Sequence, residues 1–226
     1  ESLGQTAQAR DTLLQAIALA REAQDADGLR QSLSDLGRLQ VLAGDAAGAV
    51  ASLAEATRLH AAAGATREER QATANLALAQ YVAGDKDASF LSWRRALELA
   101  RQLQDRPAEG IALARLGEIE SDLGHEPQAL ELLQQAVPVL AEVRRADEEA
   151  SAWTLIGNLH YLASRNDEAI AAYQKALALH RTLDDWPDVA IDLGNLGNAW
   201  MEAEQFEQAL GLFEEARAAA RTGKSP

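Results

Sequence analysis

The same residue types return every 40 positions along this chain, and this repeat constrains the fold more than any other feature. One position of the repeat is always alanine: Ala16, Ala56, Ala96, Ala136, Ala176 and Ala216. Alanine makes up 49 of the 226 residues. Six alanines at one position would then arise by chance about once in ten thousand trials, so a structural period is the better explanation. We therefore expect a series of similar units stacked on one another.

Three further positions of the repeat indicate how the units pack. One is always small, at Ala9, Ala49, Ser89, Ala129, Ala169 and Ala209, and another is always large and apolar, at Leu13, Leu53, Trp93, Leu133, Tyr173 and Phe213. The third is an aliphatic residue followed by glycine or alanine, at Leu36-Gly37, Leu76-Ala77, Leu116-Gly117, Ile156-Gly157 and Leu196-Gly197. Packed helices approach to about 8–10 Å, so a small residue on one helix makes room for a large one on its neighbour.

Each unit is predicted to contain two helices, since alanine, leucine, glutamate and glutamine are abundant and β-branched residues are sparse. In the third full unit, apolar residues at helical spacing predict a first helix over 108–123. Gly124 is expected to end it in the left-handed conformation, as Gly4, Gly44 and Gly84 would end others. Pro127 fits the first turn of a second helix that runs to about residue 143.

Other turn positions depart from this pattern or add to it. Ser164 and Glu204 replace the glycine in the last two units, so these turns are expected to close differently. Asp105 and Asp185 lie two residues before prolines that open first helices, where they are candidate N-caps. Pro138 lies inside a second helix, where it should remove one backbone hydrogen bond and bend the chain.

The repeated positions resemble the tetratricopeptide repeat family, in which a Leu-Gly pair is followed by a small residue, a large apolar residue and an alanine. Trp153-Thr154-Leu155-Ile156-Gly157 also supplies the tryptophan with which the family's motif begins. The usual unit has about 34 residues. The regular 40 residues here are similar to a subgroup found in peptide-binding adaptors and in bacterial multidomain regulators. The resemblance covers essentially the whole chain and is generic for function, since the fold hosts scaffolds, adaptors and peptide receptors.

The expected architecture is all-α: a single right-handed α-solenoid of eleven helices over residues 1–226. A lone helix over 5–24 precedes five helix hairpins, at 28–64, 68–104, 108–145, 148–183 and 188–221. The lone first helix lacks its partner, and the last hairpin lacks the polar capping helix that complete arrays carry. We therefore expect a fragment of a longer protein, with open ends through which a homo-oligomer could form.

Composition excludes several classes of protein. The chain has no cysteine, which rules out a disulfide scaffold and a cysteine nucleophile. No apolar run approaches the about 20 residues that span a membrane, and we expect no membrane partner. The net charge of -14 opposes nucleic-acid binding. With 18 arginines to 3 lysines, a GC-rich bacterial genome is indicated, and we expect a cytoplasmic protein.

The residues that could carry chemistry form no catalytic or metal site in the sequence. The four histidines, at positions 60, 125, 160 and 180, include no two spaced three or four apart on one helix. The glycines follow the repeat and build no phosphate-binding loop. Acidic pairs such as Glu68-Glu69 fall between units and indicate solvated surface. We therefore expect no enzyme, no metal and no cofactor.

Two columns of the first helices are expected to share one face and to line the concave groove. They hold Asp35, Asn75, Arg115, Leu155 and Asn195, and Arg38, Leu78, Glu118, Asn158 and Asn198. A side-chain amide can both donate to and accept from a peptide backbone. Asn195-Leu196-Gly197-Asn198 resembles the groove motif of the 40-residue adaptors, in which such asparagines hold peptide backbone. In the alternative interpretation, these asparagines cap or cross-link neighbouring helices.

The candidate groove residues are Arg38, Asn75, Arg115, Asn158, Asn195, Asn198, Tyr81, Tyr161 and Trp200. The two arginines could anchor an acidic side chain or a terminal carboxylate. The three aromatic residues would be anchors near the loop ends of the first helices. Tyr173 belongs to the large apolar column and is expected in the core. The lysines of a clamp for a C-terminal carboxylate are missing from both columns.

These patterns predict a non-catalytic interaction scaffold that binds a peptide or helix of a protein partner along its groove. A partner with basic character is expected because the chain is acidic. The alternative is a regulatory or sensor segment of a larger bacterial signalling or transcription-regulatory protein. Its groove would then hold an intramolecular segment or a signal peptide.

Overall fold

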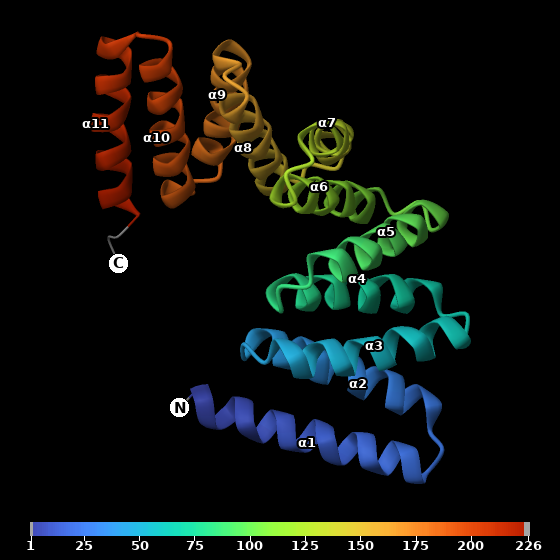
Figure 1. Cartoon of the computed structure of the whole chain (residues 1–226). Coiled ribbons are helices and arrows are strands. Elements are labelled where there is room, and N and C mark those ends of the chain that lie inside the picture. Colours follow the sequence, from blue (N-terminus) through green and yellow to red (C-terminus); the bar gives the residue numbers. More distant parts are fainter. Residues whose placement is uncertain (1, 224–226) are drawn as a thin grey trace. The chain divides into compact units, whose positions relative to one another are not determined.

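The structure is a computed structural model that describes the backbone of residues 2–223 and the side chains of residues 5–223. In this part of the chain it contains eleven α-helices and no β-strand (Figure 1), which confirms the predicted all-α fold. The helices are α1 (Ser2–Glu22), α2 (Ala26–Leu42), α3 (Ala46–Ala62), α4 (Thr66–Val82), α5 (Lys86–Gln102), α6 (Arg106–Asp122), α7 (Glu126–Glu142), α8 (Ala146–Leu162), α9 (Asn166–Thr182), α10 (Trp186–Glu202) and α11 (Phe206–Thr222). No described helix is both long and apolar enough to cross a membrane.

The helices begin at the predicted caps. Asp105 accepts a hydrogen bond from the backbone N–H of Ala108 at 3.2 Å, and Asp185 accepts one from that of Asp188 at 3.3 Å. Both N-cap predictions are therefore confirmed. Helix α7 continues through Pro138 to Glu142.

The turns after the first helices correct two predictions. Gly44, Gly84 and Gly124 adopt left-handed φ angles of 76°, 86° and 80°, as expected. The prediction for Gly4 is wrong, because α1 spans Ser2–Glu22 and this glycine does not end a helix. Ser164 and Glu204 were expected to close their turns differently, and this is also wrong, since their φ angles are 57° and 59°. The helix hairpin imposes one backbone shape, so a residue with a side chain accepts a strain of about 1–2 kcal/mol.

The glycine column lies directly against the large apolar column, as the repeat predicts. A Cβ atom added to Gly37 would lie 2.4 Å from the Leu53 side chain, and one added to Gly157 would lie 2.5 Å from the Tyr173 ring. Gly117 and Gly197 approach Leu133 and Phe213 in the same way. The small column is buried from Ala49 to Ala209, whereas Ala9 on α1 is exposed. Its serine, Ser89, donates to the carbonyl of Ala77 at 2.7 Å.

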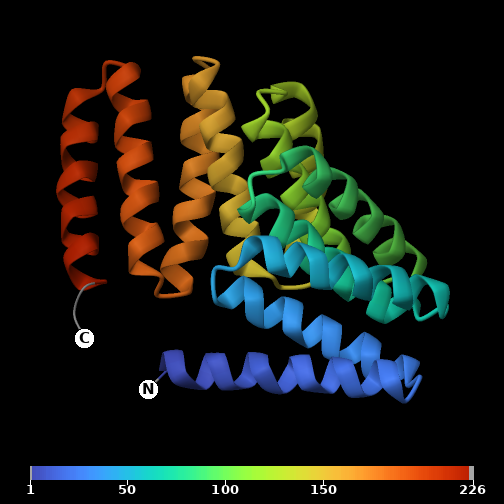
Figure 2. The ribbon, with the colours of Figure 1, turned by 60° about the horizontal axis from the view of Figure 1, so that its bottom comes forward.

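The chain divides into two compact units, unit 1 (residues 1–108) and unit 2 (residues 109–226). In each unit successive helices run in opposite directions, joined by short turns (Figures 1 and 2). In unit 1 one cluster of the core forms around Ile17, Leu33 and Leu36, and in unit 2 a cluster forms around Tyr173 and Leu193. One solenoid over residues 1–226 stays a prediction.

Candidate functional site

Four of the predicted groove residues meet at one pocket of unit 2. The pocket has a volume of 230 Å³ and is lined by Asn158, Tyr161, Leu162, Tyr173, Asn195 and Asn198. Helix α8 supplies the first three and α10 the last two, because Asn195 and Asn198 are one turn apart on α10. We call this site the asparagine pocket.

Tyr173, on α9, also lines the asparagine pocket. Its ring is buried against Gly157, and its hydroxyl donates to Oδ1 of Asn158 at 2.8 Å. Burial, then the nearby Tyr161 and Asp192, raises the pKa of Tyr173, so the hydroxyl keeps its proton. Asn158 thus cross-links α8 and α9, which is the alternative that the sequence left open for the asparagines.

Asn195 and Asn198 behave differently from Asn158. Their side chains make no hydrogen bond with any residue that the structure describes, and Asn198 is exposed. Leu162, at the rim of the asparagine pocket, is 79% exposed. An apolar rim beside unused amide groups is typical of a binding site, where a few polar groups fix the orientation of a ligand.

Unit 1 has a pocket at the same repeat position. It also has a volume of 230 Å³ and is lined by Arg38, Val41, Leu42, Asn75 and Leu78. Leu78 stands where unit 2 has Asn198, and Arg38 stands where unit 2 has Asn158. Arg38 also forms an ion pair with Asp35 at 3.4 Å. This pocket therefore offers one asparagine and one arginine instead of three asparagines.

The structure places the remaining predicted residues elsewhere. Arg115 forms an ion pair with Glu118 at 2.7 Å and lines a third pocket. Trp200 packs against the core of unit 2 and does not line the asparagine pocket. Tyr81 is half-buried near the end of α4 in unit 1.

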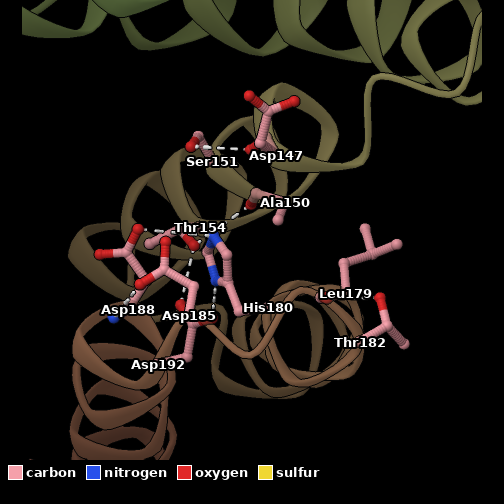
Figure 3. A network of polar contacts seen from close by, with 10 residues as sticks. All are labelled: Asp147, Ala150, Ser151, Thr154, Leu179, His180, Thr182, Asp185, Asp188 and Asp192. Carbon is pink, nitrogen blue, oxygen red and sulfur yellow. Dashed lines mark hydrogen bonds and ion pairs between the residues drawn. The ribbon is translucent and has the colours of Figure 1, made fainter. Parts of the chain in front are cut away.

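A buried polar network beside the third pocket was not predicted from the sequence (Figure 3). His180 on α9 binds Asp192 on α10 through Nδ1, at 2.6 Å from Oδ2. The Thr154 hydroxyl on α8 donates to Oδ1 of the same carboxylate at 2.8 Å. Asp192 is 0% exposed, so this Thr154–Asp192–His180 network ties three helices together in the interior of unit 2. The signal for this network in the sequence is an aspartate at a core-facing position of α10, which was not predicted to have a role.

The charges around His180 decide its protonation. Burial alone would lower its pKa, but the hydrogen bond to Asp192 and the charges of Asp192, Asp188 and Asp185 raise it overall. Asp188 approaches the other ring nitrogen, Nε2, at 3.7 Å. The ring therefore favours the imidazolium form, which a buried carboxylate stabilises.

The equivalent histidine of unit 1, His60, has different partners. Its Nε2 lies 3.2 Å from the Ser34 hydroxyl, and Ser34 occupies the same repeat position as Thr154. Ala72 occupies the position of Asp192. Burial, then the charge of Arg30, lowers the pKa of His60, while Glu68 and Glu69 oppose this shift only in part.

Comparisons with known proteins agree with the repeat architecture. A family model described as tetratricopeptide repeat matches residues 148–222. The crystal structure of BtubC (BKLC) from P. vanneervenii is similar with a TM-score of 0.80 and 20% identity, covering 98% of this chain and 94% of that one.

Two further solved structures are similar over most of this chain. A signal transduction ATPase with a tetratricopeptide repeat sensor from Pyrococcus horikoshii matches with a TM-score of 0.80 and 16% identity, over 95% of this chain and 34% of that one. The apo form of RapI matches with a TM-score of 0.78 and 14% identity, over 92% of this chain and 60% of that one. None of these matches indicates a catalytic family. Residues 148–222 thus match the tetratricopeptide repeat family, and the helix hairpins of the described chain have the fold of tetratricopeptide-like repeat structures.

Proposed function

We propose that this chain is a non-catalytic scaffold that binds an extended peptide of a protein partner at the asparagine pocket. The observation that carries the proposal is the pair Asn195 and Asn198, whose amides face a pocket and make no hydrogen bond with a described residue. Each amide can donate to a backbone carbonyl and accept from a backbone N–H of a peptide. The exposed Leu162 offers apolar contact for a side chain of the same peptide.

The rigidity of the site supports binding without a large ordering cost. Tyr173 and Asn158 hold α8 and α9 together by a hydrogen bond of 2.8 Å, and both line the asparagine pocket. Binding then orders mainly the ligand, which leaves more of the contact energy for affinity. The negative net charge favours peptides with basic residues.

The test is a selection of peptides from a random phage-displayed library on the whole chain. Affinities of the selected peptides are then measured by fluorescence anisotropy for the double variant Asn195→Ala/Asn198→Ala. We expect Kd to rise at least tenfold. Asn166→Ala, an asparagine at the start of α9 outside the pocket, is the control and should leave Kd unchanged. Selected peptides that bind the double variant equally well, or a selection that yields none, would contradict the proposal.

A second candidate function is a sensor segment of a larger signalling protein. The match to the tetratricopeptide repeat sensor of the Pyrococcus horikoshii ATPase favours it, since that sensor region has the same fold. The groove would then hold another segment of the same protein or a signal peptide. A DNA-binding, nucleotide-binding or peptidase domain encoded in the same reading frame would favour this function over a free scaffold.

A further inference from the structure

The third pocket of unit 2 combines an apolar wall with acidic groups. It has a volume of 310 Å³, and residues of α6, α8, α9 and α10 line it. Leu155 on α8 and Ile191 on α10 supply the apolar wall, and Ile191 is 54% exposed. Ligand sites typically join apolar surface of this kind to a few polar groups.

The pocket at the same repeat position of unit 1 lacks this apolar wall. It has a volume of 100 Å³, and Asp35 and Gln71 line it at the positions of Leu155 and Ile191. The helix hairpins therefore accept polar side chains at both positions. Packing of the repeat does not account for the leucine and the isoleucine of unit 2, and contact with a ligand does.

The charges that line the third pocket leave one carboxylate without a close partner. Arg115 is paired with Glu118 at 2.7 Å, and His180 is paired with Asp192 at 2.6 Å. The carboxylate of Asp188 accepts no hydrogen bond from a described residue, and its nearest cation is Nε2 of His180 at 3.7 Å (Figure 3). Its side chain is 45% exposed. Two cations thus face three carboxylates, so the pocket has one negative charge in excess.

The third pocket and the asparagine pocket follow one another along the same two helices. Leu155 precedes Asn158 by three residues on α8, and Ile191 precedes Asn195 by four on α10. A helix rises 1.5 Å per residue, so the two pockets are about 5–6 Å apart along the helices. In an extended peptide, alternate side chains point to the same side at a spacing of about 6.6 Å. One peptide can therefore place two alternate side chains in the two pockets.

From these observations we propose that the third pocket binds a lysine or arginine side chain of the peptide that occupies the asparagine pocket. This inference rests on the proposed function and adds the chemistry that selects the ligand. The aliphatic stem of the side chain packs along Leu155 and Ile191, and its charged end lies beside Asp188. Leu162 contacts an apolar side chain of the same peptide. The expected ligand thus has a basic residue two positions from an apolar one.

An acidic side chain does not fit the third pocket in the same way. Arg115 and His180 each hold a carboxylate at hydrogen-bond distance already. An added carboxylate would meet the negative charge of Asp188, and like charges at such a distance repel. A purely apolar side chain could pack on Ile191 but would gain nothing from Asp188.

The first test is the composition of the peptides that are selected on the whole chain. We expect lysine or arginine two positions from an apolar residue. One selected peptide is then synthesised with lysine, norleucine or glutamate at the basic position, and Kd is measured by fluorescence anisotropy at low ionic strength. Norleucine keeps the stem of lysine without its charge, so Kd should rise about fivefold, as for a partly exposed ion pair. Glutamate should raise Kd further.

Three variants of the chain place the effect at the third pocket. Asp188→Asn should weaken binding of the lysine peptide about fivefold and leave the norleucine peptide unchanged, because only the charge pair is removed. Asp167→Asn removes the same charge from the exposed first turn of α9, outside both pockets, and should not change the ratio of the two Kd values. Ile191→Ser shortens the apolar wall and should weaken both peptides alike, which tests the stem even if Asp188→Asn does not fold.

An NMR measurement locates the bound charge directly. Histidine rings are labelled with ¹³C, and His→Gln variants assign the four signals. The lysine peptide should shift the signal of His180, since Nε2 lies 3.7 Å from Asp188. The norleucine peptide should shift it less, and neither peptide should shift His60 in unit 1.

The inference and the proposed function fail in different ways. Peptides that lose affinity for Asn195→Ala/Asn198→Ala but bind equally well with norleucine would overturn the inference alone. Equal effects of Asp188→Asn and Asp167→Asn would do the same, because they would indicate a general effect of net charge. A selection without peptides, or with peptides that ignore both asparagines, would overturn the proposed function and this inference with it.

Discussion

His60 and His180 occupy the same position of the repeat but have different neighbours. In unit 2, Asp192 binds the ring of His180 at 2.6 Å, and Thr154 binds the same carboxylate. In unit 1, Ala72 replaces the aspartate, and Nδ1 of His60 has no partner. Both rings are buried, at 5% and 4% exposure. The repeat thus fixes the position of the ring in the sequence, and the residues of the neighbouring helices decide its protonation.

The two histidines therefore have pKa values shifted in opposite directions. The pKa of His180 is raised despite its burial, because Asp192 and its acidic neighbours favour the charged ring. That of His60 is lowered by burial and Arg30. The two buried histidines thus report on their surroundings in a comparable way, since each lies at the same position of a helix of 17 residues.

The largest effect is expected for Asp192→Ala. Removing one partner of a buried charge pair costs about 3–5 kcal/mol, because the other partner stays buried and unpaired. Hydrogen exchange followed by mass spectrometry should show faster exchange in α8, α9 and α10. Helices α2 to α4 of unit 1 are the internal control. Unchanged protection from exchange in unit 2 would mean that Asp192 contributes no more to the stability of unit 2 than an alanine does.

A smaller loss is expected where the glycine column differs between the units. Unit 1 has Ala77 and Trp93 at the repeat positions of Gly157 and Tyr173 in unit 2, where a Cβ atom added to Gly157 would lie 2.5 Å from the Tyr173 ring. Gly157→Ala should cost about 1–3 kcal/mol through overpacking, although alanine is the better helix former. Urea denaturation measures the change. The reverse substitution, Ala77→Gly, should cost about 1 kcal/mol through helix propensity alone. A stabilised Gly157→Ala chain would refute the close packing.

The hydroxyl residues of the two sites should differ in importance. Thr154→Val leaves one oxygen of the buried Asp192 without its donor, and this should cost about 1–3 kcal/mol. Ser34→Ala removes a bond to a neutral ring, for which about 0.5–1.5 kcal/mol is expected. Exchange rates in α8 and α2 give the two values. Equal free-energy costs for the two substitutions would mean that a hydroxyl group contributes no more beside a buried carboxylate than beside a neutral ring.

The smallest effect is the pH dependence of stability, which should have opposite signs at the two sites. The folded pKa of His180 is raised, so its contribution is complete below the unfolded value of about 6.5 and is lost as the pH rises through the folded value. The folded pKa of His60 is lowered, so its site loses stability as the pH falls below about 6.5. Each slope is limited to about 1.4 kcal/mol per pH unit. Local exchange of α9 and α3 between pH 5 and 8, with His180→Gln and His60→Gln as controls, measures both.

Most of the fold could be predicted because the repeat reports packing directly. Gly157 and Tyr173 lie in fixed columns, and the structure brings them into contact as the columns predict. The turn at Ser164 could not be predicted, since local preference favours glycine there and the packed hairpin overrides it. The packing of the two helices therefore determines the backbone conformation of such a residue.

The site was predictable in part. Asn158, Asn195, Asn198 and Tyr161 were expected in one groove and line one pocket. The role of Asn158 in a cross-link depends on the hydroxyl of Tyr173, which the column pattern treats as equivalent to leucine. The His180 network likewise depends on the spatial meeting of three helices, and periodicity alone does not show which polar side chains meet.

Helices α2 to α11 all have 17 residues, and three residues connect each to the next. Deleting or duplicating 40 consecutive residues anywhere in this part of the chain would therefore keep every helix and turn at its length and keep the helix faces in register. Genetic exchange between copies would carry the side chains of a whole helix pair with it, and a pocket would form between this pair and the next helix. A chain of this kind can therefore gain, lose or duplicate binding sites by whole helix pairs. Single substitutions, such as aspartate for alanine, then change the chemistry of one site without altering the helices.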